Sequence, residues 1–211
     1  EIDVSPDIKK RFHRAIGEIL RYQGKRRFIT EYSDWSRIGF FKKIFPDSKF
    51  IHIIRDGRAV ANSLLNVHWW KGRQGIYKWK IGKPPSLYLN LIEKYDNSFV
   101  AMAGVYWKFF VNQIDKKAQS LNENDYFLVK YEDLCKDPLG WSKKCLEFCE
   151  VDQEDSQFNK NFSILETTDS MIADANNKSF RIKPWREYFS SKEIEMLDDI
   201  LHDELKIFNY K

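Results

Sequence analysis

The fold class rests on residues 45 to 63, which read FPDSKFIHIIRDGRAVANS. Residues 49 to 54 within them form a nearly continuous run of apolar and β-branched side chains, a pattern typical of a strand buried on both faces of a parallel sheet. A polar turn follows at residues 55 to 58, and residues 59 to 65 are mostly small or apolar, as in a helix packed closely on the sheet. The stretch therefore predicts a strand, a turn and a helix, and open parallel sheets bind ligands at such strand ends.

Further elements are predicted on both sides of this unit. Ser5-Pro6, followed by apolar residues at helical spacing, predicts a capped amphipathic helix that ends near Gly24. Trp, Gly, Lys and Pro crowd the segment from His68 to Pro85, which predicts an irregular loop, and a second long loop is expected from Ser163 to Pro184. The other predictions are strands at 27–30 and 126–129 and helices at 35–45, 89–121, 138–150 and 190–205. The fold class is thus α/β, with a parallel sheet flanked by helices in three layers.

Composition limits the kind of protein this can be. The chain has 211 residues, of which 43% are apolar, so we expect one core and a single domain over residues 1–211. A net charge of +4, from 35 basic and 31 acidic residues, is too small and too interspersed for a nucleic-acid-binding surface. No apolar run reaches the roughly 18 residues of a membrane span, and no signal-peptide pattern occurs. The three cysteines lack zinc-site spacing, so reduced thiols and a cytoplasmic location are expected: Cys135, Cys145 and Cys149.

Arg55 and Ser63 are the candidate ligands of an anion. Arg55 follows the apolar strand directly, and Ser63 lies eight residues later, about two turns into the next helix. An anion at this place would meet a guanidinium fork, a hydroxyl donor and the unpaired amides of a helix start. The alternative is that Arg55 pairs with Asp56 at the surface while Ser63 simply packs as a small residue. Arg58 fits either a phosphate contact or a local structural role.

Residues 45 to 63 closely resemble the 3′-phosphate-binding segment of sulfotransferases. The resemblance implies a P-loop-NTPase-like fold and implies that Arg55 and Ser63 bind the 3′-phosphate of 3′-phosphoadenosine 5′-phosphosulfate. Tyr131-Glu132-Asp133-Leu134 is similar to a family segment whose Tyr lies near the adenine, which gives Tyr131 that role. Residues 178 to 186 resemble the loop that closes over the nucleotide, and Lys178 and Arg181 are its candidate phosphate contacts.

Departures from the family pattern are also visible. Family members place a Gly-rich loop for the 5′-phosphosulfate on an earlier strand, and no such loop occurs in this sequence, so we expect a fold that is incomplete at its N-terminal end. The chain opens on Glu1 rather than Met, in line with that expectation. Relatives tend to carry Lys where this chain has Thr30-Glu31. Glu31 there puts the usual cationic help to the leaving group in doubt. Because relatives use a His or a carboxylate as general base, Glu31 is a candidate for that role, with a solvated or ion-paired carboxylate as the alternative.

The expected reaction is in-line transfer of a sulfuryl group from 3′-phosphoadenosine 5′-phosphosulfate to a hydroxyl or amine, without a metal, leaving adenosine 3′,5′-bisphosphate. The acceptor stays open among carbohydrates, lipids, phenols and peptides. One alternative is a catalytically silent nucleotide-binding fragment or degenerate relative. Another is a nucleotide-kinase-like phosphotransferase, although the Lys-Ser/Thr phosphate loop and magnesium-binding Asp that it needs are not apparent.

Other aromatic and histidine side chains have mainly structural interpretations. His52 lies within the central strand, as a core or edge residue with a catalytic role as the alternative. Three tryptophans of the loop, Trp69, Trp70 and Trp79, fit either an acceptor pocket or the core. Trp107 and Phe110 are expected in the core.

Overall fold

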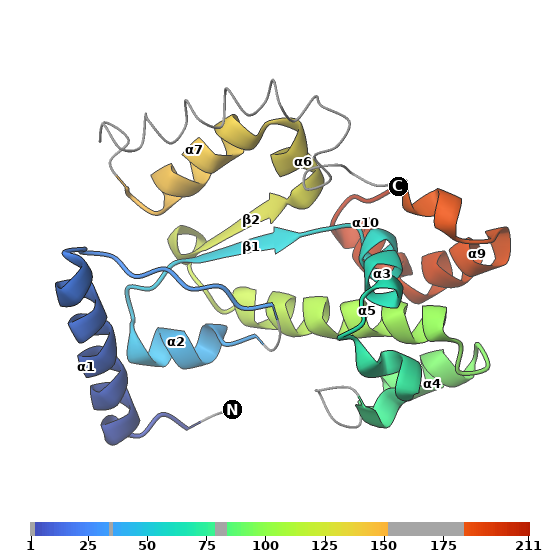
Figure 1. Cartoon of the computed structure of the whole chain (residues 1–211), viewed down its shortest axis with the longest axis horizontal. Coiled ribbons are helices and arrows are strands. Elements are labelled where there is room, and N and C mark those ends of the chain that lie inside the picture. Colours follow the sequence, from blue (N-terminus) through green and yellow to red (C-terminus); the bar gives the residue numbers. More distant parts are fainter. Residues whose placement is uncertain (1–2, 34–35, 79–83, 152–183) are drawn as a thin grey trace.

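The computed structural model describes residues 3–33, 36–78, 84–151 and 184–211. Its central feature is a pair of parallel strands, β1 (Phe50–Ile54) and β2 (Tyr126–Lys130), paired in register from Phe50 opposite Tyr126 to Ile54 opposite Lys130. Figure 1 shows helices on both sides of this pair, with α6 (Tyr131–Lys136) and α7 (Pro138–Phe148) above it and α5 (Phe99–Ala118) below it. The α/β class and both of these strands are confirmed.

Among the described residues the sheet contains only β1 and β2. The predicted three-layer, P-loop-NTPase-like arrangement is therefore not confirmed. The strand predicted at residues 27–30 is wrong: this segment is irregular, and its Arg27 donates instead to the carbonyl oxygens of Cys149 and Glu150. An extended segment without a neighbouring strand has no ladder partners for its backbone. The prediction that β1 is buried on both faces is also wrong at Ile53, which is 53% exposed.

The N-terminal helix α1 (Pro6–Gln23) forms as predicted. The Ser5 hydroxyl accepts a hydrogen bond from the Ile8 amide at 3.3 Å, and Gly24 ends the helix in the left-handed conformation at φ 62°. Phe12 of α1 meets Phe40 of α2 (Ile38–Ile44) edge to face, with ring centroids 5.3 Å apart. Because α2 begins at Ile38 and ends at Ile44, the helix predicted at residues 35–45 is shorter than expected.

The single helix predicted from residue 89 to residue 121 is wrong, because two helices occupy this region. They are α4 (Ser86–Glu93) and α5, separated by a turn in which Asp96 and Asn97 have φ values of 52° and 55°. Left-handed residues cannot continue a right-handed helix. Ser98 then starts α5 as its N-cap, since its side chain accepts from the Ala101 amide at 3.1 Å.

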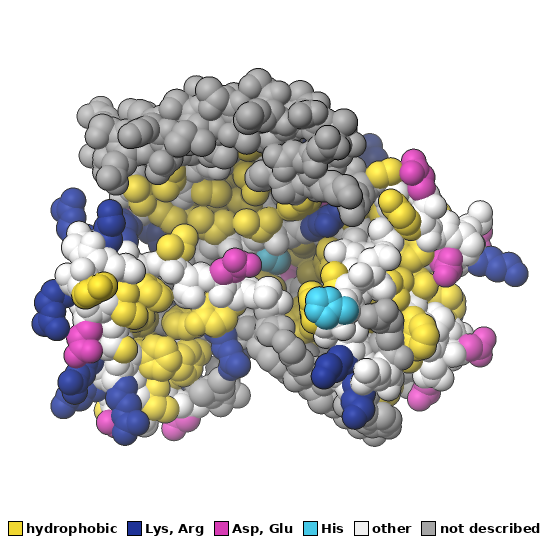
Figure 2. All heavy atoms as spheres, viewed as in Figure 1, with side chains coloured by type: hydrophobic (Ala, Val, Ile, Leu, Met, Phe, Trp, Pro, Cys, Tyr) yellow, Lys and Arg dark blue, Asp and Glu magenta, His cyan; other side chains and the backbone are white. Residues whose placement is uncertain are grey.

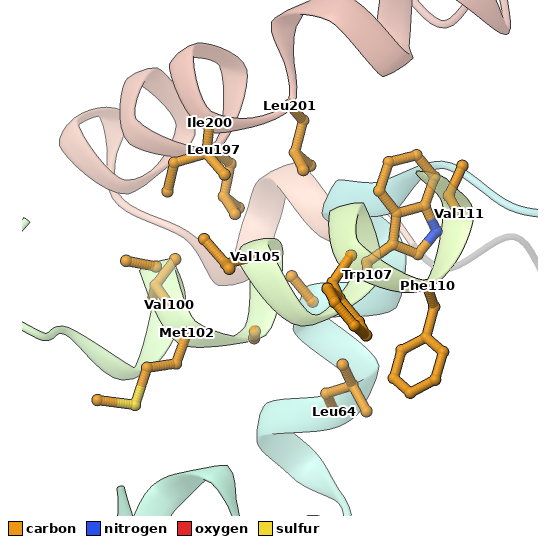
Figure 3. Packing of buried hydrophobic residues seen from close by; sticks show 14 of the residues in the cluster. Leu64, Val100, Met102, Val105, Trp107, Phe110, Val111, Leu197, Ile200 and Leu201 are labelled. Atoms are coloured by element: carbon orange, nitrogen blue, oxygen red, sulfur yellow. The ribbon is translucent and has the colours of Figure 1, made fainter. Parts of the chain in front are cut away.

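The core lies where α5 packs between α3 (Gly57–Asn66) and α9 (Ser191–Ile200). Figure 3 shows Leu197 and Ile200 of α9 on one side of α5, with Leu64 of α3 on another. Trp107 and Phe110 are buried here, as predicted. The last helix, predicted at residues 190–205, is divided in two: α9 starts after Ser190, which forms a capping box with Glu193, and α10 (His202–Ile207) follows after Leu201.

Short 3₁₀ helices complete the described structure. Two of them replace part of the loop predicted from residue 68 to residue 85, whereas the loop predicted from residue 163 falls outside the described residues except for Pro184. The four are η1 (Lys71–Gln74), η2 (Ile76–Lys78), η3 (Glu123–Asp125) and η4 (Trp185–Tyr188).

Replacing Gly57 by Ala should destabilise the fold. A Cβ at this position would lie 2.6 Å from the Trp107 ring and 2.8 Å from a Leu201 methyl group, so the close approach of α3 to α5 and to Leu201, between α9 and α10, would be lost. Overpacking of this kind costs about 1 to 3 kcal/mol. The measurement is the free energy of unfolding in urea. As the matched control, Gly17→Ala in α1 meets no atom within 4 Å and should instead stabilise by about 0.5 to 1 kcal/mol.

Candidate nucleotide-binding site

The turn between β1 and α3 carries the candidate site. Asp56 is the N-cap of α3, and its carboxylate accepts from the Arg58 amide at 2.9 Å. Arg55 lies just before this cap, at the carboxyl end of β1. The sequence thus places a cation, a helix start and a strand end at one point, which is where parallel sheets bind ligands.

Arg55 has an unpaired guanidinium within the described structure. Its side chain is half-buried and its Nε atom is buried without a hydrogen-bond acceptor. The guanidinium lies over the ring of Tyr131, whose centroid is 4.8 Å from Cζ. A buried donor without an acceptor carries a free-energy cost. The alternative pairing of Arg55 with Asp56 is wrong, because that carboxylate is engaged elsewhere.

Arg58 is the partner of Asp56, and its role is structural. Its Nε and Nη2 atoms donate to the two Asp56 oxygens at 3.0 and 2.8 Å, and its Nη1 donates to Asp198 at 2.8 Å. Nη2 also reaches the Lys211 carbonyl at 2.7 Å, and the guanidinium covers the Trp185 ring at 4.5 Å. Burial opposes the charged form, but the hydrogen bonds to Asp56 and Asp198 outweigh it and raise the Arg58 pKa. Arg58 has little capacity left for a ligand.

Ser63 lies on the exposed side of α3. It follows Asp56 by seven residues, which is two helical turns, so the two residues share one side of the helix. Its neighbours Ala61, Asn62 and Leu64 are buried. The Ser63 hydroxyl is accessible to a ligand, and its joint binding of one anion with Arg55 stays a prediction.

Tyr131 opens α6 and supplies the aromatic face on which Arg55 rests. Burial is the main cause that raises its pKa, so the hydroxyl stays protonated. The next residue, Glu132, was not predicted to contact the site. Its Oε1 accepts from the Asp56 amide at 3.0 Å, and its Oε2 accepts from the Tyr210 hydroxyl at 2.9 Å. Only the position of Glu132 beside Tyr131 hinted at this contact in the sequence, and nothing there pointed to Tyr210.

The remaining predicted residues do not join this cluster in the described structure. Glu31 is exposed, on the irregular segment between α1 and α2. Trp69 is 52% exposed and Trp70 is buried at 3%. Three predicted residues, Lys178, Arg181 and Trp79, lie outside the described residues.

Among the residues with a described placement, no three His, Cys, Asp or Glu side chains gather as metal ligands. Within that same part of the chain, every helix is too short or too polar to cross a bilayer.

His52 is held neutral by its surroundings. Its Nδ1 lies 2.6 Å from the Tyr126 hydroxyl oxygen on the neighbouring strand, and burial lowers its pKa from 6.5 to about 4. Burial likewise raises the pKa of Tyr126. A base this weak accepts a proton poorly near neutral pH. These contacts favour the structural interpretation of His52.

A hollow of about 230 Å³ opens between α1 and α2. Four aromatic side chains and one cation line it: Phe12, Tyr32, Arg37, Phe40 and Phe41. Figure 2 shows hydrophobic side chains gathered over this part of the molecule, with Lys and Arg side chains around them. The hollow therefore suits an apolar ligand better than a nucleotide phosphate.

Comparison with known proteins identifies the family. The sequence model of the sulfotransferase family matches residues 5–155, so the chain belongs to that family. Two curated relatives are the omega-hydroxy-beta-dihydromenaquinone-9 sulfotransferases of Mycobacterium bovis and Mycobacterium tuberculosis. Each is 23% identical over 132 residues, which cover 63% of this chain and 30% of the relative. The chain therefore aligns with less than a third of these relatives, and no solved structure matches it.

The pH dependence of stability should report the environment of His52. Unfolded chains bind the proton near pH 6.5, whereas the folded chain binds it only near pH 4. Between these values the unfolded state holds more protons, so the free energy of unfolding falls as pH falls from 6.5 toward 4. In His52→Gln this contribution should vanish, giving a flatter profile in urea unfolding across that range. Exposed His68, replaced in the same way, should leave the profile as in the wild type; an equal slope in His52→Gln contradicts the assignment.

Proposed function

We propose that the turn between β1 and α3 binds the 3′-phosphate of 3′-phosphoadenosine 5′-phosphosulfate, through Arg55 and Ser63. We further propose that the protein transfers the sulfuryl group of this donor to a hydroxyl or amine acceptor. The observation that carries the proposal is the unpaired Arg55 guanidinium at the carboxyl end of β1. Membership of the sulfotransferase family supports the donor class.

The contrast between two neighbouring arginines strengthens the argument. Arg58 uses its donors on two carboxylates and a carbonyl, whereas Arg55, three residues earlier, has no acceptor among the described residues. Because both oxygens of Asp56 are occupied by Arg58, this neighbouring carboxylate does not pair with Arg55. A phosphate is the chemical partner that a planar guanidinium next to helix amides suits best.

Tyr131 gives the guanidinium of Arg55 a defined plane. An arginine stacked on an aromatic face is restricted in orientation, so less side-chain entropy is lost when it binds. In the proposal the same aromatic side chain lies beside the adenosine part of the donor.

The bound donor supplies an activated sulfuryl group, whose bond to the 5′-phosphate oxygen breaks as a bond to the acceptor oxygen or nitrogen forms. The described residues contribute position and charge: Arg55 and Ser63 hold the nucleotide by the phosphate farthest from the reacting atoms. Such remote binding energy helps to orient the donor for in-line transfer. The proton acceptor is left unassigned, because exposed Glu31 makes no hydrogen bond or ion pair within the described structure that distinguishes it from other carboxylates.

We propose an apolar hydroxyl compound as the acceptor class. The hollow between α1 and α2 is lined by aromatic rings, which bury apolar groups well. The curated relatives are named for a hydroxylated menaquinone, which also joins an apolar chain to a hydroxyl group. A carbohydrate would need more polar side chains than this hollow offers.

Nucleotide selectivity is the direct test of the 3′-phosphate site. Adenosine 3′,5′-bisphosphate at about 100 times its dissociation constant should stabilise the protein by roughly 2.7 kcal/mol. Adenosine 5′-monophosphate, which lacks the 3′-phosphate, should stabilise it much less at the same concentration. Arg55→Ala should abolish this difference in thermal unfolding, because the guanidinium is the main partner of the phosphate. Exposed Arg21→Ala in α1 is the matched control and should retain the wild-type difference; an unchanged preference in Arg55→Ala would falsify the phosphate role.

Ser63→Ala should weaken binding less than Arg55→Ala does. Loss of one hydroxyl hydrogen bond to a charged phosphate should weaken adenosine 3′,5′-bisphosphate binding about tenfold and leave adenosine 5′-monophosphate binding unchanged. Isothermal titration calorimetry with both nucleotides measures the two effects. Ser191→Ala, at another exposed helical serine, is the control. Equal weakening of both nucleotides would place Ser63 away from the 3′-phosphate.

A further inference from the structure

The two peptide groups that flank Arg55 are both held by one pair of side chains. The Tyr210 hydroxyl lies 3.2 Å from the carbonyl oxygen of Ile54, in the peptide before Arg55. Glu132 accepts from the amide of Asp56, in the peptide after Arg55, at 3.0 Å. Tyr210 also donates to Glu132 at 2.9 Å, so the two contacts form one connected network.

Tyr210 also joins the carboxyl ends of both strands. Lys130 is paired with Ile54 in the sheet register, and its Nζ lies 4.8 Å from the centroid of the Tyr210 ring. The same Nζ donates to the Asn209 carbonyl at 3.2 Å. Figure 1 shows the C-terminal end of the chain close to the ends of β1 and β2 and to α6. Residues at the far end of the sequence thus close the edge of the sheet at which the candidate site lies.

The network holds the backbone on both sides of Arg55, whose own side chain has no hydrogen-bond acceptor in the described structure. No carboxylate or carbonyl of the described chain orients the Arg55 side chain, and its one aromatic support, Tyr131, belongs to the same helical turn as Glu132. The position of the guanidinium is therefore set by its backbone and by α6, and Glu132 connects these two elements. Burial is the main cause that raises the Tyr210 pKa, so its hydroxyl remains a donor at neutral pH.

We propose that Glu132 and Tyr210 are positioning residues of the phosphate site, which fix the direction in which Arg55 presents its guanidinium. This inference rests on the proposed function, since it concerns the same site. Neither residue touches the phosphate; each acts through the backbone on either side of Arg55. A displacement of about 1 Å in such a group is enough to weaken a geometrically demanding contact.

The inference differs from a purely structural role in what it predicts for selectivity. A residue that only stabilises the fold changes the fraction of folded protein, and this affects the apparent affinity for both nucleotides equally. A residue that positions Arg55 changes the affinity for adenosine 3′,5′-bisphosphate and leaves that for adenosine 5′-monophosphate unchanged. The ratio of the dissociation constant for adenosine 5′-monophosphate to that for adenosine 3′,5′-bisphosphate therefore separates the two roles.

The experiment measures this ratio by calorimetry in the purified full chain, at a temperature where urea unfolding shows each variant to be folded. Tyr210→Phe should lower the ratio about tenfold, because it removes the one hydroxyl proton that lies between the Glu132 carboxylate and the Ile54 carbonyl oxygen. Glu132→Ala should lower it at least as much. Glu132→Gln should retain it within about twofold, because the amide oxygen still accepts from Asp56 and its amino group donates to the Tyr210 oxygen. Tyr188→Phe, at an exposed tyrosine of η4, should match the wild type.

Three results would decide against the inference or its basis. A wild-type ratio in both Tyr210→Phe and Glu132→Ala overturns the positioning role while the proposed function stands. Equal loss in Glu132→Gln and Glu132→Ala also overturns it, because the charge of Glu132 rather than its geometry would then matter. A wild-type protein without preference for the 3′-phosphate overturns the proposed function itself. If Glu132→Ala fails to fold, Tyr210→Phe and Glu132→Gln decide by the same criteria.

Discussion

The bidentate pair of Asp56 and Arg58 is the interaction on which the rest of the structure depends. It lies at the junction of β1 and α3, with Nε and Nη2 of Arg58 at 3.0 and 2.8 Å from the two carboxylate oxygens. Buried ion pairs of this kind need further hydrogen bonds to offset desolvation, and Asp198 and the Lys211 carbonyl supply them here. The pair therefore connects the start of α3 with α9 and the C-terminal residues, and it leaves Arg55 uncompensated.

The packing around α5 sets the geometry of this junction. Gly57, the first residue of α3, leaves room for the Trp107 ring and for Leu201, so α3 starts close to the core. A second buried pair, between Lys108 of α5 and Glu204 of α10 at 2.7 Å, joins the last helix to the same core. This ion pair holds α10 against α5, and α10 leads the chain to the edge of the sheet at which its C-terminal residues lie. The candidate site is thus built from three distant parts of the chain: the β1–α3 turn, α6 and residues 210–211.

Much of the fold follows from local pattern. The strand at residues 49–54, the strand near residue 126 and the capped helix after Ser5 all formed where short-range signals placed them. The helix predicted from residue 89 to residue 121 failed because an apolar periodicity can continue across a turn, and only the left-handed Asp96 and Asn97 reveal the break. The strand predicted at residues 27–30 failed for a different reason: an apolar run becomes a strand only when another strand supplies its hydrogen bonds.

The sequence by itself determined the family segment from residue 45 to residue 63, the strand–turn–helix unit and the candidacy of Arg55, because these depend on residues adjacent in the chain. It left open whether Arg55 pairs with Asp56 and whether Arg58 contacts a phosphate or has a local structural role. Only the tertiary structure decided that Arg58 takes the carboxylate, because Asp198, Trp185 and Lys211, all more than a hundred residues away, gather around that one guanidinium. The roles of Glu132 and Tyr210 likewise arise from contacts across 76 to 156 residues of chain, which no local pattern records.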